Sequence, residues 1–438
     1  MRKASVLVLV LAAACGDDGN HNVGDGPTSG DGARNDGSTS DAAADLVFVT
    51  VSQGGAPRAG VQIYFQNADS TTAGSAVTDS SGSASQILGA GGYVTAVDPF
   101  LLDLPAAQSD QLYTIAGVQP GDHLVFSTPV SGGAAPPELD FTLTVPYAPT
   151  AYNYSIDTVC GNYNFPHDDS GTTAPPTHTV TLYGCPAIVD ALVTANGPDG
   201  ELLGSFWSMQ QPILSGATID LSAHTYEAPV TSTVTANTDD NVYIQRLVYA
   251  SQGLIFTAIG DVATAGGHAD ATLVLPMLDG ATRETEVRFD EPYTSAVITT
   301  WGPTAGDETI DVDSGALAPF TSAPSLSVSA DAIAWTTGTG AVPDFVTAGY
   351  YDTRADRTWS WRIAAPSGTS VTFPTLPAAG AEWNPSPTDS ITSVAVELLA
   401  VPGGWSATRP SVFGDFFFVL GTTGTGAAAT ASYSGSPD

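Results

Sequence analysis

Apolar and polar positions alternate along most of the chain, in short runs separated by turn residues. Leu46 to Val51 is a continuous β-favouring run, and Val61, Ile63 and Phe65 then alternate with polar neighbours. An apolar residue at every second position predicts a strand with one buried face. Such runs recur about every 8–12 residues with Gly, Pro and Asp between them, which is typical of sandwiches and barrels. The pattern therefore predicts an all-β protein.

A break in this pattern divides the predicted strands. Residues 131–137 are rich in Gly, Ala and Pro and separate a first β-region from a longer second one, which we divide again by size. We expect tandem β-sandwich domains over residues 46–130, 138–275 and 276–438. The strand and turn at 191–200 resemble those at 296–306. This likeness leaves a duplication of the later units open, because β-turn patterns alone also produce it.

The first fifteen residues have the layout of a secretory signal. Residues 1–3 carry positive charge, residues 4–11 are apolar, and three alanines precede Cys15. The apolar run is shorter than the roughly 20 residues of a transmembrane helix. A cysteine directly after small residues resembles the lipobox of bacterial lipoproteins, although Ala12 stands where that family usually has Leu.

The lipobox resemblance implies removal of residues 1–14, acylation of Cys15 and anchoring in the cell envelope. We expect the outer membrane of a Gram-negative bacterium. The alternative is an ordinary signal peptide cut near Ala14, which leaves Cys15 as a free thiol. The cysteine count favours lipidation, because Cys160 and Cys185 then remain as an even pair.

Residues 15–45 contain almost no apolar side chain beyond alanine. Such a segment cannot bury enough surface to offset its loss of conformational entropy, so we expect a disordered acidic linker. Asp-Gly pairs begin at Asp25, Asp31 and Asp36. Calcium loops also use Asp and Gly, but the EF-hand spacing with its final Glu is absent, which favours a solvated linker.

Residues 55–97 contain three turn-and-strand motifs. They are the G-x-P-x-x-G-V-x-I segment from Gly55 to Ile63, the T-D-x-x-G turn from Thr78 to Gly82, and the L-x-x-G-G-Y-x-x-x-V segment from Leu88 to Val97. This stretch resembles the carboxypeptidase regulatory-like domain, which has a transthyretin-like β-sandwich fold. In that family the domain is a non-catalytic appendage, so the resemblance implies an accessory or scaffold role.

The charge is strongly acidic, with 45 Asp and Glu residues against 11 Lys and Arg and a formal net charge of −34. Lysine occurs once, at Lys3. Binding to nucleic acid requires clustered Lys and Arg, so a nucleic-acid partner is excluded. A membrane-attached chain of this charge is repelled by anionic headgroups and held only through its acyl chains.

Cys160 and Cys185 lie beside predicted strands of the second unit. In an exported protein such a pair favours a disulfide. The alternative is a zinc site that also uses His167 and His178, which lie between the two cysteines. The spacing matches no zinc signature, so we expect the disulfide and no metal or other cofactor.

Catalytic motifs are scarce. His224 and Glu227 fit the H-x-x-E pattern of the metallocarboxypeptidases, but two residues at this spacing are common in loops. Neither H-E-x-x-H nor G-x-S-x-G occurs. We therefore expect no catalytic residues and a protein that is not an enzyme.

Six of the seven tryptophans fall after residue 300. Exposed indoles stack on sugar rings, and residues two apart in a strand share one face, so Trp359 and Trp361 are candidates for a ligand site together with Trp383 and Trp405. Burial in sandwich cores is the competing interpretation. The sequence thus predicts a non-enzymatic surface lipoprotein with a scaffold, adhesion or ligand-display role, whose partner is a surface protein or a glycan. The alternative is a carbohydrate-binding accessory protein.

Overall fold

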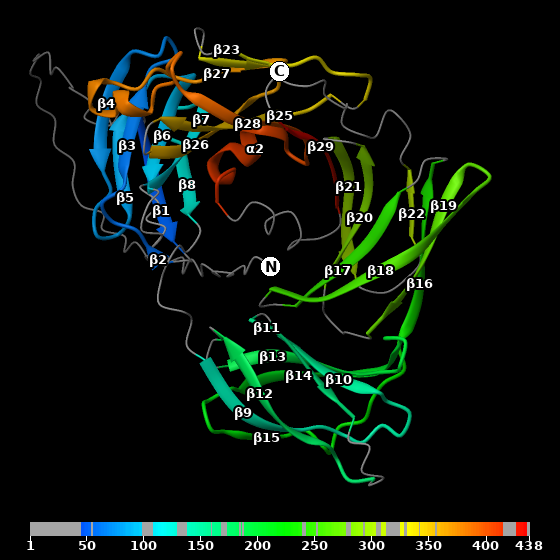
Figure 1. Cartoon of the computed structure of the whole chain (residues 1–438). Coiled ribbons are helices and arrows are strands. Elements are labelled where there is room, and N and C mark those ends of the chain that lie inside the picture. Colours follow the sequence, from blue (N-terminus) through cyan, green and yellow to red (C-terminus); the bar gives the residue numbers. More distant parts are fainter. Residues whose placement is uncertain are drawn as a thin grey trace, which may run out of the picture.

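The computed structural model describes most of residues 45–435 (Figure 1). The segments left out within this range are 54–55, 99–107, 129–137, 159, 168–172, 184, 186–187, 239–241, 251–252, 277–281, 292–293, 304–307, 312–324, 328–330, 341, 355–356 and 415–425. The predicted signal peptide, Cys15 and nearly all of the predicted linker lie outside the described residues. Strands dominate the described part, which confirms the all-β fold class.

Residues 46–128 form two facing sheets. One sheet places β1 (Leu46–Gln53) between β5 (Ser83–Ile87) and β8 (His123–Thr128), with the short β2 (Ala56–Pro57) beside the end of β1. The facing strands run in the order β4 (Thr72–Val77), β3 (Gln62–Gln66), β6 (Gly92–Asp98) and β7 (Gln108–Val118). Val47, Val49 and Val51 are at most 1% exposed. The predicted alternation therefore builds the core between the sheets.

The turn at Thr78–Gly82 forms for the reason that its residues predict. The carboxylate of Asp79 accepts hydrogen bonds from the backbone N–H groups of Ser81 (2.8 Å) and Ser83 (3.0 Å). Gly82 has φ of 72°, and a Cβ there would lie 2.4 Å from the carbonyl oxygen of Val51. Only glycine combines this backbone angle with so close an approach.

A second sandwich, which we call the middle sandwich, is formed by residues 138–226 and lies at the bottom of Figure 1. Its sheets have the orders β11-β10-β13-β14 and β12-β9-β15. The strands are β9 (Glu138–Thr144), β10 (Asn153–Thr158), β11 (Gly161–Pro166), β12 (Thr177–Tyr183), β13 (Ile188–Asn196), β14 (Leu202–Pro212) and β15 (Thr218–Asp220). Its core includes Phe141, Tyr154 and Val180, and every member of that core comes from this one stretch of chain.

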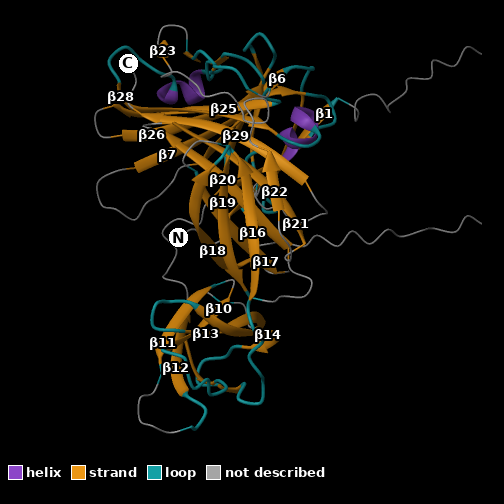
Figure 2. Cartoon of the chain, turned by 90° about the vertical axis from the view of Figure 1, so that its right-hand side faces the viewer, coloured by secondary structure: helices purple, strands orange, loops and turns teal. Residues whose placement is uncertain are grey.

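Eleven further strands join β4, β3, β6 and β7 in one fifteen-stranded sheet of order β22-β16-β19-β18-β17-β20-β21-β29-β28-β25-β26-β7-β6-β3-β4. Its further strands are β16 (Val230–Asn237), β17 (Tyr243–Ala250), β18 (Gly253–Ala265), β19 (His268–Leu275), β20 (Thr282–Glu291), β21 (Thr294–Pro303), β22 (Glu308–Asp311), β25 (Phe345–Arg354), β26 (Arg357–Pro366), β28 (Ser390–Ala400) and β29 (Gly426–Gly435). Figure 2 shows this sheet running from the top of the molecule, at β25 and β26, down to β17 and β18, with the middle sandwich below them.

Separate segments cover the two faces of β25, β26 and β28. On one face lie a small sheet of β23 (Ser325–Ser327), β24 (Ala332–Ala334) and β27 (Ser370–Thr372), and the 3₁₀ turn η2 (Ala378–Trp383). The other face packs on the N-terminal sandwich, with α2 (Gly404–Thr408) and η3 (Arg409–Ser411) beside it. Gly380 of η2 is buried, and a Cβ there would lie 2.9 Å from the ring of Tyr64. This glycine lets η2 lie against β3.

The strand pairing revises the predicted arrangement of three tandem domains. β7 pairs in parallel with β26 from Gln108↔Arg357 to Ile115↔Ala364, so the first predicted unit shares a sheet with the last. The predicted boundary at 275/276 falls between β19 and β20, which belong to this same sheet. Turn residues mark where a strand ends, but they carry no information about which distant strand completes a sheet.

Candidate functional site: the charged cluster around Trp383

The structure brings three of the four candidate ligand-binding tryptophans to one core and separates the fourth from them. Trp359 and Trp361 belong to the core under the small sheet, and Trp383 packs against it. Trp405 instead packs on the opposite face of the large sheet, with its ring centroid 5.3 Å from that of Phe345. A single binding surface formed by all four residues is therefore not present.

The prediction that Trp359 and Trp361 bind a ligand is wrong for this structure. Both side chains are 0% exposed, and Trp301 and Trp335 are also buried. The indole Nε1 of Trp361 donates a hydrogen bond to Thr114 Oγ1 at 2.8 Å, and its ring meets Phe373 edge-on. Sharing one strand face placed the two indoles together as predicted, but the small sheet and η2 cover that face. Trp383 and Trp405 are half-buried.

Trp383 lies within a cluster of charged side chains. Its Nε1 donates to Asp110 Oδ2 at 2.8 Å, and the guanidinium of Arg357 stands 5.5 Å from its ring centroid. Arg357 also forms ion pairs with Asp110 (3.4 Å) and Glu382 (3.0 Å). The cluster therefore links η2 to the start of β26 and to β7.

Arg354 supplies a second link, from the other side of the β25–β26 turn. Its Nε and NH2 groups donate to the two carboxylate oxygens of Asp389 at 2.6 and 2.5 Å. It also donates to the carbonyl oxygens of Glu382 and Asn384 at 3.1 and 2.8 Å, and its guanidinium stands 5.1 Å from the ring centroid of Trp359. A bidentate pair of this kind fixes orientation as well as distance. Both arginines thus hold residues 382–389 onto the sheet.

Asp352 lies beneath these ion pairs and is 0% exposed. Burial raises its pKa well above the usual aspartate value, and the neighbouring Asp389 carboxyl raises it further. Burial acts in the same direction on Asp389, but the hydrogen bonds from Arg354 and from the backbone of Ser386 and the charge of Arg354 oppose it, and the pKa of Asp389 is lowered. Asp352 is therefore the carboxyl of the pair that holds its proton more tightly. Two adjacent carboxyls that share one proton avoid the repulsion of two charges.

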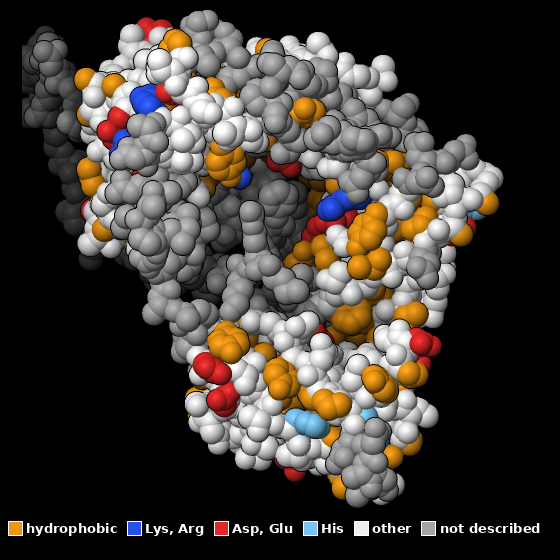
Figure 3. Space-filling view, in the orientation of Figure 1, with side chains coloured by type: hydrophobic (Ala, Val, Ile, Leu, Met, Phe, Trp, Pro, Cys, Tyr) orange, Lys and Arg blue, Asp and Glu red, His pale blue; other side chains and the backbone are white. Residues whose placement is uncertain are grey.

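A second carboxyl with a raised pKa lies farther along the large sheet, on the half-buried Glu284 of β20. Burial and the nearby Glu286 raise the pKa of Glu284 to about 7. Glu286 itself accepts a hydrogen bond from Gln245 and lies 3.5 Å from the guanidinium of Arg288. On the face drawn in Figure 3, the few basic side chains lie among acidic and neutral ones. In both clusters most of the described charged groups form ion pairs or hydrogen bonds with other members of the same cluster.

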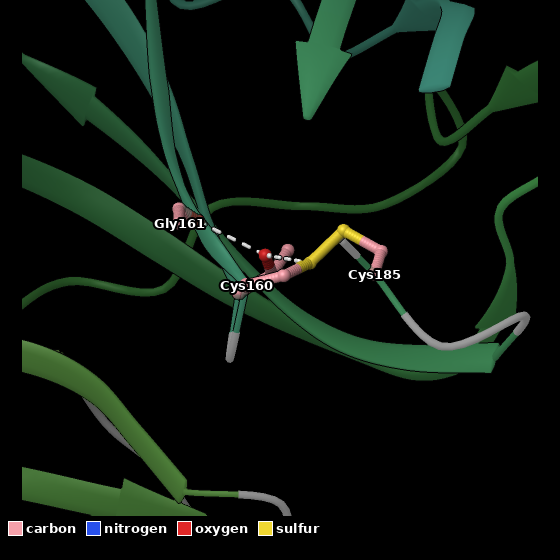
Figure 4. Close-up of a disulfide and its surroundings, with 4 residues drawn as sticks. Cys160, Gly161 and Cys185 are labelled. Atoms are coloured by element: carbon pink, nitrogen blue, oxygen red, sulfur yellow. Dashed lines mark hydrogen bonds between the residues drawn. A yellow bond between two sulfur atoms is a disulfide. The ribbon is translucent and has the colours of Figure 1, made fainter. Parts of the chain in front are cut away.

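The structure pairs Cys160 with Cys185, as the sequence predicts (Figure 4). Their Cα atoms are 5.1 Å apart, and Thr158 Oγ1 lies 3.2 Å from Cys160 Sγ. The bond ties the β10–β11 turn in one sheet of the middle sandwich to the chain that follows β12 in the other. The zinc alternative is therefore not realised by these cysteines.

The histidines of the middle sandwich pack on aromatic rings. His178 lies 4.7 Å from the ring of Phe165, and His224 is stacked 4.7 Å from Phe206. The Nδ1 atom of His167 is 3.1 Å from the hydroxyl of Tyr154. Over the described residues, no group of three or more His, Cys, Asp and Glu side chains has the arrangement of a metal site.

Sequence reasoning missed the acidic and basic members of the Trp383 cluster. Arg354 and Arg357 are two of only eleven basic residues, they lie three positions apart in the sequence, and they are paired in register between β25 and β26. Two arginines this close together, in a chain with so few basic residues, were the signal from which the cluster could have been predicted. Asp110 offered none, because it lies about 250 residues away in the chain and reaches the cluster only through the pairing of β7 with β26.

The helices of the described part are short, and none has the length and apolar composition that a bilayer crossing requires. Cys15 lies outside the described residues, so its lipidation stays a prediction.

No family model matches the chain, and no curated protein matches it. Among solved structures, the TIE protein of Bacillus anthracis aligns at 11% identity with a TM-score of 0.16, covering 61% of this chain and 50% of that one. The chain thus spans half the length of that protein. An adhesin candidate from Bacteroides ovatus aligns at 8% identity with a TM-score of 0.13, covering 56% of this chain and 71% of that one. These distant similarities assign no family, and the carboxypeptidase regulatory-like resemblance stays a prediction.

Proposed function

We propose that this protein is a non-enzymatic lipoprotein of the bacterial cell envelope that presents a β-sheet body as an adhesion or scaffold surface. Cys15 carries the acyl anchor, in the outer membrane of a Gram-negative bacterium, and residues 16–45 form the acidic spacer. As a flexible chain of about 30 residues the spacer reaches roughly 30 Å. Repulsion between the acidic chain and anionic headgroups keeps the body away from the membrane.

The observation that carries this proposal is the joining of the N-terminal sandwich to the C-terminal strands. β7 and β26 pair in parallel over eight residue pairs, from Gln108↔Arg357 to Ile115↔Ala364. Side-chain hydrogen bonds add to this strand pairing. Trp361 donates a hydrogen bond to Thr114, and Gln66 Nε2 donates one to the carbonyl oxygen of Thr375 at 2.7 Å. A body attached near its N-terminus is thereby continuous with its most distant strands. This continuity suits a protein that holds a surface in place, rather than one that must open and close.

The partner of this surface is a surface protein or a glycan. The ion pairs of Arg354 and Arg357 around Trp383 hold η2 on the sheet, which supports a structural role for this cluster. The resemblance of residues 55–97 to a non-catalytic module agrees with an accessory role. Fold alone does not determine function, so this part of the proposal depends on the following experiment.

The experiment compares cells that carry the wild-type chain, Cys15→Ser or the matched control Ala13→Ser. A fatty-acid probe should label the wild type and Ala13→Ser but not Cys15→Ser. Only the labelled forms should stay with the membrane fraction and increase attachment of cells to surfaces coated with envelope protein or glycan. Equal labelling of Cys15→Ser would contradict the anchor. Labelled, membrane-bound protein without any gain in attachment would contradict the adhesion role.

A further inference from the structure

The first described strand, β1, lies inside its sheet and not at an edge. β1 lies between two neighbours, antiparallel to β5 from Leu46↔Ile87 to Thr50↔Ser83 and parallel to β8 from Phe48↔His123 to Gln53↔Thr128. Backbone bonds reach both sides, because Phe48 N–H donates to Asp122 at 2.9 Å and Val51 N–H donates to Gly82 at 2.8 Å. Leaving the sheet would also expose its buried valines to water.

The direction of the two strands decides how a pull acts on them. The chain from Cys15 enters β1 at Leu46, and the chain to the middle sandwich leaves β8 at Thr128. Because β1 and β8 are parallel, these two points lie at opposite ends of the pair. A force between the anchor and the middle sandwich therefore runs along the strands, and all their hydrogen bonds share the load. A force across one end would instead break the residue pairs one after another.

When β1 is pulled, β8 cannot move along with it, because side-chain and backbone hydrogen bonds hold β8 to the rest of the folded chain. Arg409 Nε and NH2 donate to the two carboxylate oxygens of Asp122, each at 2.8 Å, and both side chains are about nine-tenths buried. Ser127 N–H donates to the carbonyl oxygen of Phe413 at 2.7 Å. Sliding of β1 past β8 thus has to break the ladder itself.

We propose that the β1–β8 pair bears mechanical tension between the membrane anchor and the body. The proposal rests on the proposed function, because it takes Cys15 as the point of attachment. A protein that holds a cell to a partner is loaded between these two points whenever the partner moves. The parallel pair is then the element through which the load enters the folded chain.

Single-molecule pulling on the purified chain without residues 1–14 tests this proposal. Cys15 is a natural thiol handle, because Cys160 and Cys185 are bonded to each other. One second handle is Glu138→Cys, an exposed position where β9 begins, which loads the β1–β8 pair along its length. The other is Ile87→Cys, which is 55% exposed and directly opposite Leu46, so it peels β1 from one end.

We expect the rupture force through Glu138→Cys to be at least about twice that through Ile87→Cys at the same loading rate, because forced unfolding follows the height of the unfolding barrier. Equal forces, or a lower force through Glu138→Cys, would overturn the proposal.

A matched pair of core variants identifies the strand that resists the pulling force. Val49 of β1 and Val94 of β6 are both buried in the same core, at 1% and 0% exposure. Val49→Ala should lower the rupture force through Glu138→Cys clearly more than Val94→Ala, while the two variants lower thermal stability to a similar extent. The opposite ranking would place the load-bearing strand elsewhere. Failure here leaves labelling and attachment unchanged, so it is distinguishable from failure of the proposed function.

Discussion

The middle sandwich and the N-terminal sandwich have the same architecture but are completed in different ways. The middle sandwich draws all of its core from one stretch of chain and closes it with the bond between Cys160 and Cys185. The core of the N-terminal sandwich includes Phe345, Leu399 and Val412, which are contributed by the other end of the chain. The first is locally complete, and the second depends on contacts between residues far apart in sequence.

The comparison shows two solutions to the same problem of limited burial. A sandwich of fewer than about 100 residues buries a smaller fraction of its surface than a large domain, so it needs additional stabilisation. A covalent bond supplies this in the middle sandwich by restricting the unfolded chain. In the N-terminal sandwich the additional stabilisation comes from extension of the sheet, because β26 and its neighbours enlarge the common core.

The largest expected effects come from removing a buried ring in each region. Trp361→Ala should destabilise the joined sheet by about 3–5 kcal/mol, and Phe141→Ala should destabilise the middle sandwich by a similar amount. Hydrogen exchange in urea should show Trp361→Ala lowering protection of β7 and β26 but not of β9, and Phe141→Ala doing the reverse. Loss of protection in both regions from either variant would mean that they unfold as one unit.

Removal of the disulfide should have a slightly smaller effect, confined to the middle sandwich. Closing a loop of 25 residues restricts the unfolded chain by roughly 3.5 kcal/mol in the entropic model, so Cys160→Ser with Cys185→Ser should lose about that much. The measurement is urea unfolding followed by exchange in β10 and β12, with β1 and β8 as the internal control. An equal fall in the protection of β1 would show that the N-terminal sandwich depends on the middle one.

The smallest effects concern pH, and they differ between the two regions. Burial raises the pKa of Asp157, in the middle sandwich, from 3.8 to about 6, against the opposing hydrogen bond from Ser155. Burial raises the pKa of Glu284, in the large sheet, from 4.5 to about 7. Each carboxyl holds its proton more tightly when folded, so the native state binds more protons and stability falls as pH rises between the two values.

The middle sandwich should therefore lose stability between about pH 4 and 6, and the large sheet between about pH 4.5 and 7, by about 3 kcal/mol each. Asp157→Asn should flatten the first dependence and Glu284→Gln the second, as measured by exchange in each region from pH 4 to 8. A rise in stability across these ranges would show that the carboxyls are ionised in the native state.

Much of the local structure could be predicted from the residues. The run Leu46 to Val51 is a strand with alternating burial, the Asp79 turn uses the bonds that its side chain offers, and the cysteine pair is bonded. The candidate site could be predicted only in part. The indoles of Trp359 and Trp361 do share one face, but their burial depends on η2, whose place is fixed by Arg354 and by a glycine that fits against Tyr64.

The all-β class, the turns and the disulfide could be predicted from the residues alone. The first two follow from hydrogen bonds and side chains that are close together in the chain, and the disulfide follows from a count of cysteines that leaves one possible pair. Contacts between distant segments decided the pairing of β7 with β26, the contact of Asp110 with Trp383, and the burial of Trp359 and Trp361. Strand patterns specify which face of a strand is apolar but not which distant strand lies beside it. That choice depends on the packing of the whole chain, where the burial of large rings outweighs any local preference.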